Sequence, residues 1–363
     1  MWAEVVLVAV QATLGGRGAA AGVERDGGGM VAAMGAAQDG AAQRARELWS
    51  GGERGEAVKV LEAALAAAPE EVVLRRQLSE ALLALHRYAA ALECAKGLGR
   101  DGAALRGAAL FKLGRHAEAL EELPSGDAAS LRLRIDAAEA LGRFGEGDRA
   151  LEQWLALVGG DHPEAARLRG LRAARDGKHE QAAGEFELAL KRDPCDAAAL
   201  FGLGQALKRL GRKERALEVL AEHRRVTPLL DQLEFAERAV DMDPRHGSNW
   251  AAVGDAQRAL GRVELARAAY VRATQLAKDE EVVVIALRHA RLESEDAKDV
   301  AAAVALLEAA GARQNDARVW VRAGDLVLER GEREKARGYF ERALALRPGD
   351  AQIVKRLEAA KGL

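Results

Sequence analysis

Residues 247–278 read GSNWAAVGDAQRALGRVELARAAYVRATQLAK, and the spacing of their apolar and small side chains decides the fold. Steps of three and four residues place side chains on one face of a helix. Such steps join Trp250, Val253 and Gly254 before Gly261, and Ala266, Tyr270 and Ala273 after it. Two helices approach to about 8–10 Å where small side chains lie at the crossing. We therefore expect a helical hairpin that turns at Gly261 and needs further copies of itself to bury both faces.

Such copies occur along most of the chain. The turn motif recurs as RLGRKERALEVL, ALGRVELARAAY and ERGEREKARGYF, which contain Gly211, Gly261 and Gly331. The full spacing recurs in Gly170, Gly177, Ala182, Phe186, Ala189 and Pro194; in Leu200, Leu203, Gly204, Leu207, Gly211, Ala216, Leu220 and Pro228; and in Trp320, Gly324, Gly331, Ala336, Phe340, Ala343 and Pro348. Pro194 and Pro228 are 34 residues apart. In this signature and period the chain resembles the tetratricopeptide repeat (TPR) family.

The resemblance implies an all-α fold, a right-handed superhelix (solenoid) of TPR-like helical hairpins over about residues 41–363. In that family the first helix of each hairpin lines a concave groove that binds peptides. We therefore expect a non-catalytic scaffold or adaptor for protein–protein interaction. Two alternatives stay open: the recruitment or regulatory arm of a larger enzyme, and a cell-envelope assembly factor.

The composition argues against nucleic-acid binding, membrane spans and a disulfide framework. The 54 Lys and Arg residues nearly balance the 56 Asp and Glu residues, so the totals lack the basic footprint of a nucleic-acid-binding protein. No apolar run reaches the roughly 18 residues that a membrane span needs. Cys94 and Cys195 are far apart and form no C-x-x-C motif, so no disulfide framework is expected. We expect a cytoplasmic protein, with export to the periplasm as the alternative.

The repeat pattern divides the chain into four parts. Residues 1–40 are rich in glycine and are interpreted as a flexible leader. We expect degenerate repeats at residues 41–160, regular repeats at residues 161–348 and a capping helix at residues 349–363. An irregular helix is expected at 228–244. Thr227 as N-cap and Pro228 as first helical residue give it a start signal. It represents either a unit that lost its first helix or an extended or inserted helix.

The chain contains none of the common catalytic or metal-binding motifs. G-x-S-x-G, H-E-x-x-H, the phosphate-binding Walker loop and C-x-x-C are all missing from the sequence. We therefore expect no enzyme activity, cofactor or metal. His86 and His116 are interpreted as equivalent turn positions of adjacent units, where solvated turn residues are favoured over a metal site.

The groove positions typical of the family define the candidate partner-binding residues. In the clear repeats these positions hold Arg167, Arg175, Phe201, Gln205, Lys208, Arg209, Ser248, Asp255, Arg258, His289, Arg318, Arg322 and Asp325. Their mildly basic character predicts a protein or peptide partner with acidic side chains. The clear repeats lack the Lys and Asn pair, four residues apart, of the family's carboxylate-clamp groove, which disfavours binding of chaperone C-terminal tails. The sequence leaves the oligomeric state open.

Overall fold

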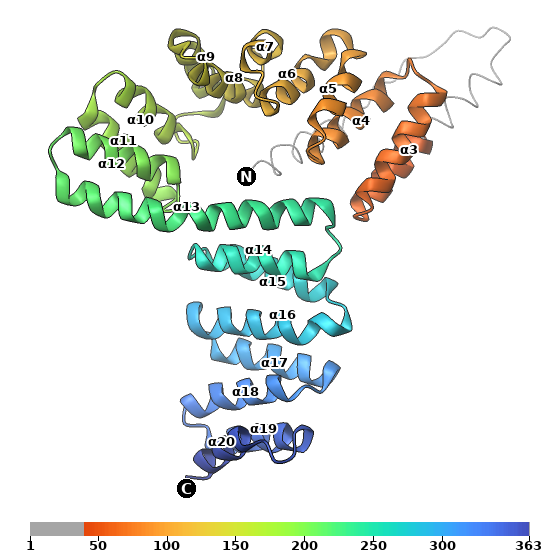
Figure 1. The fold of residues 1–363 in the computed structure, drawn as a ribbon, viewed down its shortest axis with the longest axis vertical. Coiled ribbons are helices and arrows are strands. Elements are labelled where there is room, and N and C mark those ends of the chain that lie inside the picture. Colours follow the sequence, from red (N-terminus) through yellow and green to blue (C-terminus); the bar gives the residue numbers. More distant parts are fainter. Residues whose placement is uncertain (1–39, 363) are drawn as a thin grey trace. The chain divides into compact units, whose positions relative to one another are not determined.

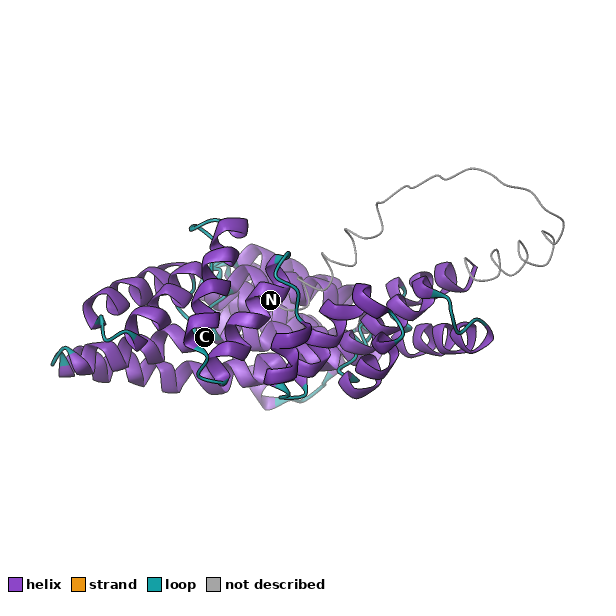
Figure 2. Ribbon diagram, turned by 90° about the horizontal axis from the view of Figure 1, so that it is seen from above, coloured by secondary structure: helices purple, strands orange, loops and turns teal. Residues whose placement is uncertain are grey.

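The computed structural model describes residues 40–362, and every regular element in that range is a helix (Figures 1 and 2). The predicted all-α repeat fold is confirmed. The leader expected at residues 1–40 lies outside the described residues except for Gly40, which is helical. The chain forms two compact units, Met1–His223 (unit 1) and Arg224–Leu363 (unit 2).

In unit 1, consecutive helices pack together as hairpins. Its described helices are residues 40–50, α3 (Arg54–Ala67), α4 (Val72–Ala84), α5 (Tyr88–Lys96), the 3-10 turn η1 (Gly99–Gly102), α6 (Ala103–Lys112), α7 (His116–Glu122), α8 (Ala128–Ala140), α9 (Phe144–Val158), α10 (Ala165–Arg175), α11 (His179–Arg192) and α12 (Ala197–Arg209). Several are shorter than those of unit 2, since α5 has 9 residues and α7 has 7. The predicted boundary at residue 160 between degenerate and regular repeats stays a prediction.

Unit 2 continues with the same kind of hairpin. Helix α13 (Lys213–Met242) contains the boundary of the two units and is followed by α14 (Gly247–Ala259), α15 (Val263–Leu276), α16 (Asp279–Arg291), the π-helical turn η2 (Leu292–Asp296), α17 (Val300–Gln314), α18 (Ala317–Glu329), α19 (Arg333–Leu346) and α20 (Ala351–Lys361). The Asp350 side chain accepts hydrogen bonds from the amides of Gln352 and Ile353, which fixes the start of α20.

Glycines in the first helices set how closely each hairpin packs. A Cβ atom added at Gly254 would come within 2.9 Å of the Tyr270 ring on the next helix. The same relation, over the same interval of 16 residues, joins Gly170 to Phe186, Gly204 to Leu220 and Gly324 to Phe340. The predicted interface residues Ala266 and Ala273 are both fully buried. The interval of 16 residues in the sequence thus corresponds to a contact between the two helices of a hairpin, in which a large side chain fills the space left by a glycine.

The hairpin turns require a left-handed backbone. Gly177, Gly211, Gly261 and Gly331 have φ angles between 74° and 78°, where glycine is the favoured residue. In the shorter units of the N-terminal part, this position belongs to His86, Gly114 and Gly142. His116 instead begins helix α7. The interpretation of His86 and His116 as equivalent positions was therefore wrong: His86 corresponds to Gly114.

Helix α13 is the main departure from the expected local structure. It runs for 30 residues with Pro228 inside it, so no helix begins at Thr227 and Pro228. That predicted start is wrong, and the structure has the extended-helix alternative. Leu229, Leu230 and Gln232 after Pro228 are good helix formers, and Val226, Leu233 and Val240 are buried. Their packing outweighs the one backbone hydrogen bond that proline cannot donate.

Candidate partner-binding surface

In unit 2 the first helices of successive hairpins lie side by side. Helix α14 contacts α16, α16 contacts α18, and α18 contacts α20. Side chains on the outer face of these helices therefore form one surface, which we call the first-helix face. In unit 1 the same relation joins α10 to α12. These faces hold the candidate residues.

Most charged candidates on the first-helix face of unit 2 pair with a residue of a neighbouring hairpin. Asp255 accepts a hydrogen bond from Arg288 at 2.9 Å, and Asp325 pairs with Arg356 at 3.0 Å. Two further candidates share one acidic partner in the turn after α16. Arg258 lies 3.0 Å and Arg322 3.3 Å from the carboxylate of Glu295.

The carboxylate of Glu295 therefore pairs with an arginine of α14 and with an arginine of α18. The hydrogen bond from Arg291, at 2.8 Å, is the main reason why the pKa of Glu295 lies below its usual range. Arg258 also contacts Asp296. The mildly basic character that the sequence predicts for the groove positions is thus largely neutralised within unit 2. The neutralising carboxylates of Glu295 and Asp296 belong to a turn, outside the family's groove positions.

Two further arginines of the candidate set are also paired. Arg167 bonds to Glu164 at 3.0 Å and to Asp196 at 3.1 Å, and only 18% of its side chain is exposed. It links α10 to the N-terminal cap of α12. Arg318 pairs with Asp316, which caps its own helix, at 2.9 Å.

Helix α12 carries the candidates that are available to a partner. Gln205, Lys208 and Arg209 are exposed, and neither cation has an ion pair with the described residues. Phe201, one turn before Gln205, is 50% exposed. This part of the predicted surface has the accessibility that partner binding needs.

His289 is not accessible, which corrects its assignment to the groove. Only 4% of the residue is exposed, and its ring stacks on Tyr270 with centroids 5.5 Å apart. Its Nε2 lies 3.4 Å from the buried carboxylate of Glu293, which also accepts hydrogen bonds from Arg267 at 2.6 and 3.0 Å. Burial lowers the pKa of His289, an effect that Glu293 opposes. The residue is a packed core group.

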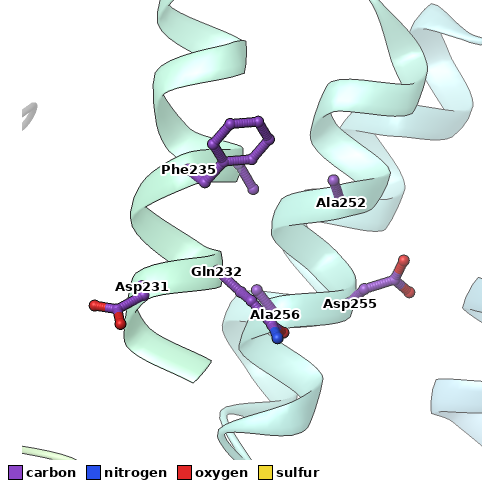
Figure 3. Close-up of a pocket in the computed structure, with 7 residues that line it drawn as sticks. Asp231, Gln232, Phe235, Ala252, Asp255 and Ala256 are labelled. Atoms are coloured by element: carbon purple, nitrogen blue, oxygen red, sulfur yellow. The ribbon is translucent and has the colours of Figure 1, made fainter. Parts of the chain in front are cut away.

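Sequence reasoning missed a pocket between α13 and α14, with a volume of about 450 Å³ (Figure 3). Its lining residues are Asp231, Gln232, Phe235, Ala236, Ala252, Asp255 and Ala256. Figure 3 shows the Phe235 ring at one end of the pocket, with Gln232 and Ala256 lying between the helices. Phe235 is 78% exposed. The sequence signal for this pocket is a large apolar residue, Phe235, within the charged stretch DQLEFAER.

Two further features are missing from the described residues. These residues include no group of three or more His, Cys, Asp or Glu residues placed to hold a metal ion. Between Gly40 and Gly362, no helix combines the length and apolar character that crossing a bilayer requires.

Packed hairpins with glycine turns and glycine–aromatic contacts define an α-helical repeat protein. A family model described as "Tetratricopeptide repeat" matches residues 133–194, 167–228 and 292–351. The chain therefore contains tetratricopeptide repeats in residues 133–228 and 292–351.

The solved structures that it resembles include proteins described as TPR proteins. TTC0263, a thermophilic TPR protein of Thermus thermophilus, is 21% identical and has a TM-score of 0.32, with 56% of this chain and 100% of that one covered. The P58(IPK) TPR domain is 18% identical over 90% of this chain and 97% of its own, with a TM-score of 0.25. MamA from AMB-1 is 22% identical over 47% and 95%, with a TM-score of 0.28. No curated protein matches the sequence.

Proposed function

We propose that this chain is a scaffold that holds a segment of a partner protein against the first helices of its hairpins. TPR repeats support a role in protein interaction in general, and the identity of the partner belongs to the proposal. The observation that carries it is the accessibility of α12, where Gln205, Lys208 and Arg209 are exposed and the two cations lack ion pairs with described residues.

The chemistry of α12 favours a partner segment with acidic side chains at this position. Lys208 and Arg209 lie in the last turn of the helix. Both can bond to a carboxylate without breaking an existing ion pair, which Arg258 and Arg322 of unit 2 cannot do. The predicted acidic preference is therefore proposed for α12 alone. The described residues give no specific support to the enzyme-arm or envelope-assembly alternatives.

Affinity capture with matched charge-reversal variants tests this proposal. Partners captured by the full chain are identified and then compared between the wild type and Lys208→Glu/Arg209→Glu. We expect at least a tenfold loss of the bound partner, because exposed groove charges steer and select partners. Lys191→Glu, an exposed cation on the second helix α11, is the control and should retain binding. Equal capture by all three proteins would remove α12 from the binding surface.

A further inference from the structure

Arg175 shows how an aromatic ring and a carboxylate on one helix contribute to holding a guanidinium, together with Glu139 of α8, to which its Nη1 donates at 2.7 Å. Phe144 and Asp148 are four residues apart on α9 and therefore share a face. The Arg175 guanidinium carbon lies 4.8 Å from the centre of the Phe144 ring, and its Nη2 donates to both Asp148 oxygens at 2.7 and 2.8 Å. Such a site combines cation–π attraction with a charge-assisted hydrogen bond.

Helix α13 carries the same two side-chain types without an arginine. Asp231 and Phe235 are also four residues apart, in the opposite order along the helix. Asp231 is exposed and makes no ion pair or side-chain hydrogen bond with the described residues. Phe235 is 78% exposed, whereas Phe144, which has its arginine, is 43% exposed. Covering this exposed ring with a ligand would remove apolar surface from water, which favours binding.

The pocket beside Phe235 suits a long side chain with an apolar stem. Ala236, Ala252 and Ala256 provide small apolar walls, and the volume of about 450 Å³ accommodates an arginine. The stem of an arginine packs well on apolar surface while its head stays polar.

The charge of this part of α13 favours a cation. Residues 229–242 contain four acids, Asp231, Glu234, Glu237 and Asp241, and a single base, Arg238. Arg238 is already paired with Glu234. Residues 229–242 therefore carry a formal net charge of −3, four acids against one base, whereas the exposed end of α12 carries two cations.

We propose that the pocket between α13 and α14 binds an arginine side chain of a partner protein segment. The inference rests on the proposed scaffold function and adds a residue-level preference to it. Arginine is favoured over lysine because a planar guanidinium stacks on an aromatic ring and bonds to a carboxylate at the same time. Asp255 stays bonded to Tyr270 and Arg288, so the free carboxylate is that of Asp231. This side chain points away from α14 in Figure 3 and has to turn toward the Phe235 ring when the arginine binds.

A defined peptide tests the pocket without knowledge of the partner. The full chain, labelled with ¹³C at alanine methyl groups, is titrated with acetyl-Ala-Leu-Arg-Leu-Ala-amide, and the methyl signals of Ala252 and Ala256 are followed. We expect saturable shifts at both methyl groups. The lysine version should bind several-fold more weakly, and the version with uncharged citrulline should bind at least tenfold more weakly. Equal binding of the arginine and citrulline peptides would overturn the proposal.

Matched variants assign the binding to the two proposed groups. Phe235→Ala should abolish the shifts, and Asp231→Asn should weaken binding about tenfold. The controls Leu265→Ala and Glu358→Gln remove an exposed apolar group and an exposed carboxylate elsewhere in unit 2, and both should bind as the wild type does. Unchanged binding by Phe235→Ala would also overturn the proposal.

Two further measurements distinguish an arginine from a second copy of the chain and separate the pocket from the surface of α12. Sedimentation of the wild type and Phe235→Ala detects a second copy of the chain as the occupant. Loss of a wild-type dimer in the variant would assign the pocket to self-association and overturn the arginine proposal. Capture of a partner that depends on Lys208 and Arg209 but not on Phe235 would leave the scaffold function standing and refute the arginine pocket.

Discussion

Gly324 of helix α18 lies against the ring of Phe340 on α19, where an added Cβ atom would come within 2.5 Å of ring carbon Cε1. Phe340 is fully buried, so its ring cannot move aside freely. We expect Gly324→Ala to lower the free energy of unfolding by about 1 kcal/mol. Overpacking costs about 1–3 kcal/mol, which exceeds the roughly 1 kcal/mol that alanine gains over glycine in a helix. Urea unfolding of both proteins measures the difference.

Gly338 on α19 provides the control for this prediction. It is exposed, and a Cβ atom there would meet nothing within 4 Å. Gly338→Ala should therefore show the helix-propensity gain alone, about 0.5–1 kcal/mol of added stability. A Gly324→Ala protein at least as stable as the wild type would contradict the proposed role of the glycine–aromatic contact.

The turn at His86 is strained relative to the equivalent turns. His86 has a φ angle of 57°, in a position that Gly114 and Gly142 occupy in the next two units. A left-handed conformation costs a non-glycine residue about 1–2 kcal/mol. His86→Gly is expected to raise the unfolding free energy by about 1 kcal/mol, in spite of losing the exposed hydrogen bond between Nδ1 and the Tyr88 hydroxyl.

A second substitution separates backbone strain from the loss of the imidazole. His86→Ala removes the same ring and hydrogen bond but keeps a Cβ atom in the left-handed conformation. Thermal unfolding should show a higher midpoint for His86→Gly than for both the wild type and His86→Ala. Equal midpoints for the two variants would show that the turn carries no strain.

The hairpin core could be predicted from sequence because it depends on local spacing. Gly254 and Tyr270 belong to the same hairpin, so a fixed interval along the chain corresponds to a fixed contact in space. Gly261 marks its turn for the same reason, since a left-handed residue there favours glycine. Repetition of these residues in successive units made the pattern recognisable.

The surface could be predicted less well because charge pairing extends between hairpins. Arg258 and Arg322 were identified as groove cations, but their shared partner Glu295 lies in an irregular π-helical turn. His289 was assigned from a family position, although its unit lacks the usual glycine turn. Glu293, one helical turn later, pairs with it inside the protein.

Burial of His289 makes stability depend on pH. Its pKa is lowered by burial, with Glu293 acting in the opposite direction and Arg267 in the same direction. The unfolded chain therefore binds a proton at His289 near its ordinary pKa of about 6.5, where the folded protein resists protonation. At and below about pH 6.5 the unfolded state binds more protons than the folded state. The contribution of neutral His289 to the free energy of unfolding is therefore complete above about pH 6.5 and declines as the pH falls through and below this value.

A comparison of His289→Gln with the wild type isolates this contribution. Glutamine does not titrate, and its amide can donate a hydrogen bond to Glu293. The unfolding midpoint of the wild type should fall more between pH 7.5 and pH 5.5 than that of the variant. Parallel pH dependence in the two proteins would show that His289 does not couple folding to protonation.

Pro228 provides a direct test of the continuous helix α13. A proline in a helix interior costs about 3 kcal/mol relative to alanine, and relaxation of its surroundings reduces this value. Pro228→Ala should therefore raise the unfolding free energy by at least about 1 kcal/mol in urea. If a helix instead began at this residue, proline would already be favourable there and the substitution would bring no gain. Pro194→Ala, in the turn after α11, is the matched control and should not stabilise the protein.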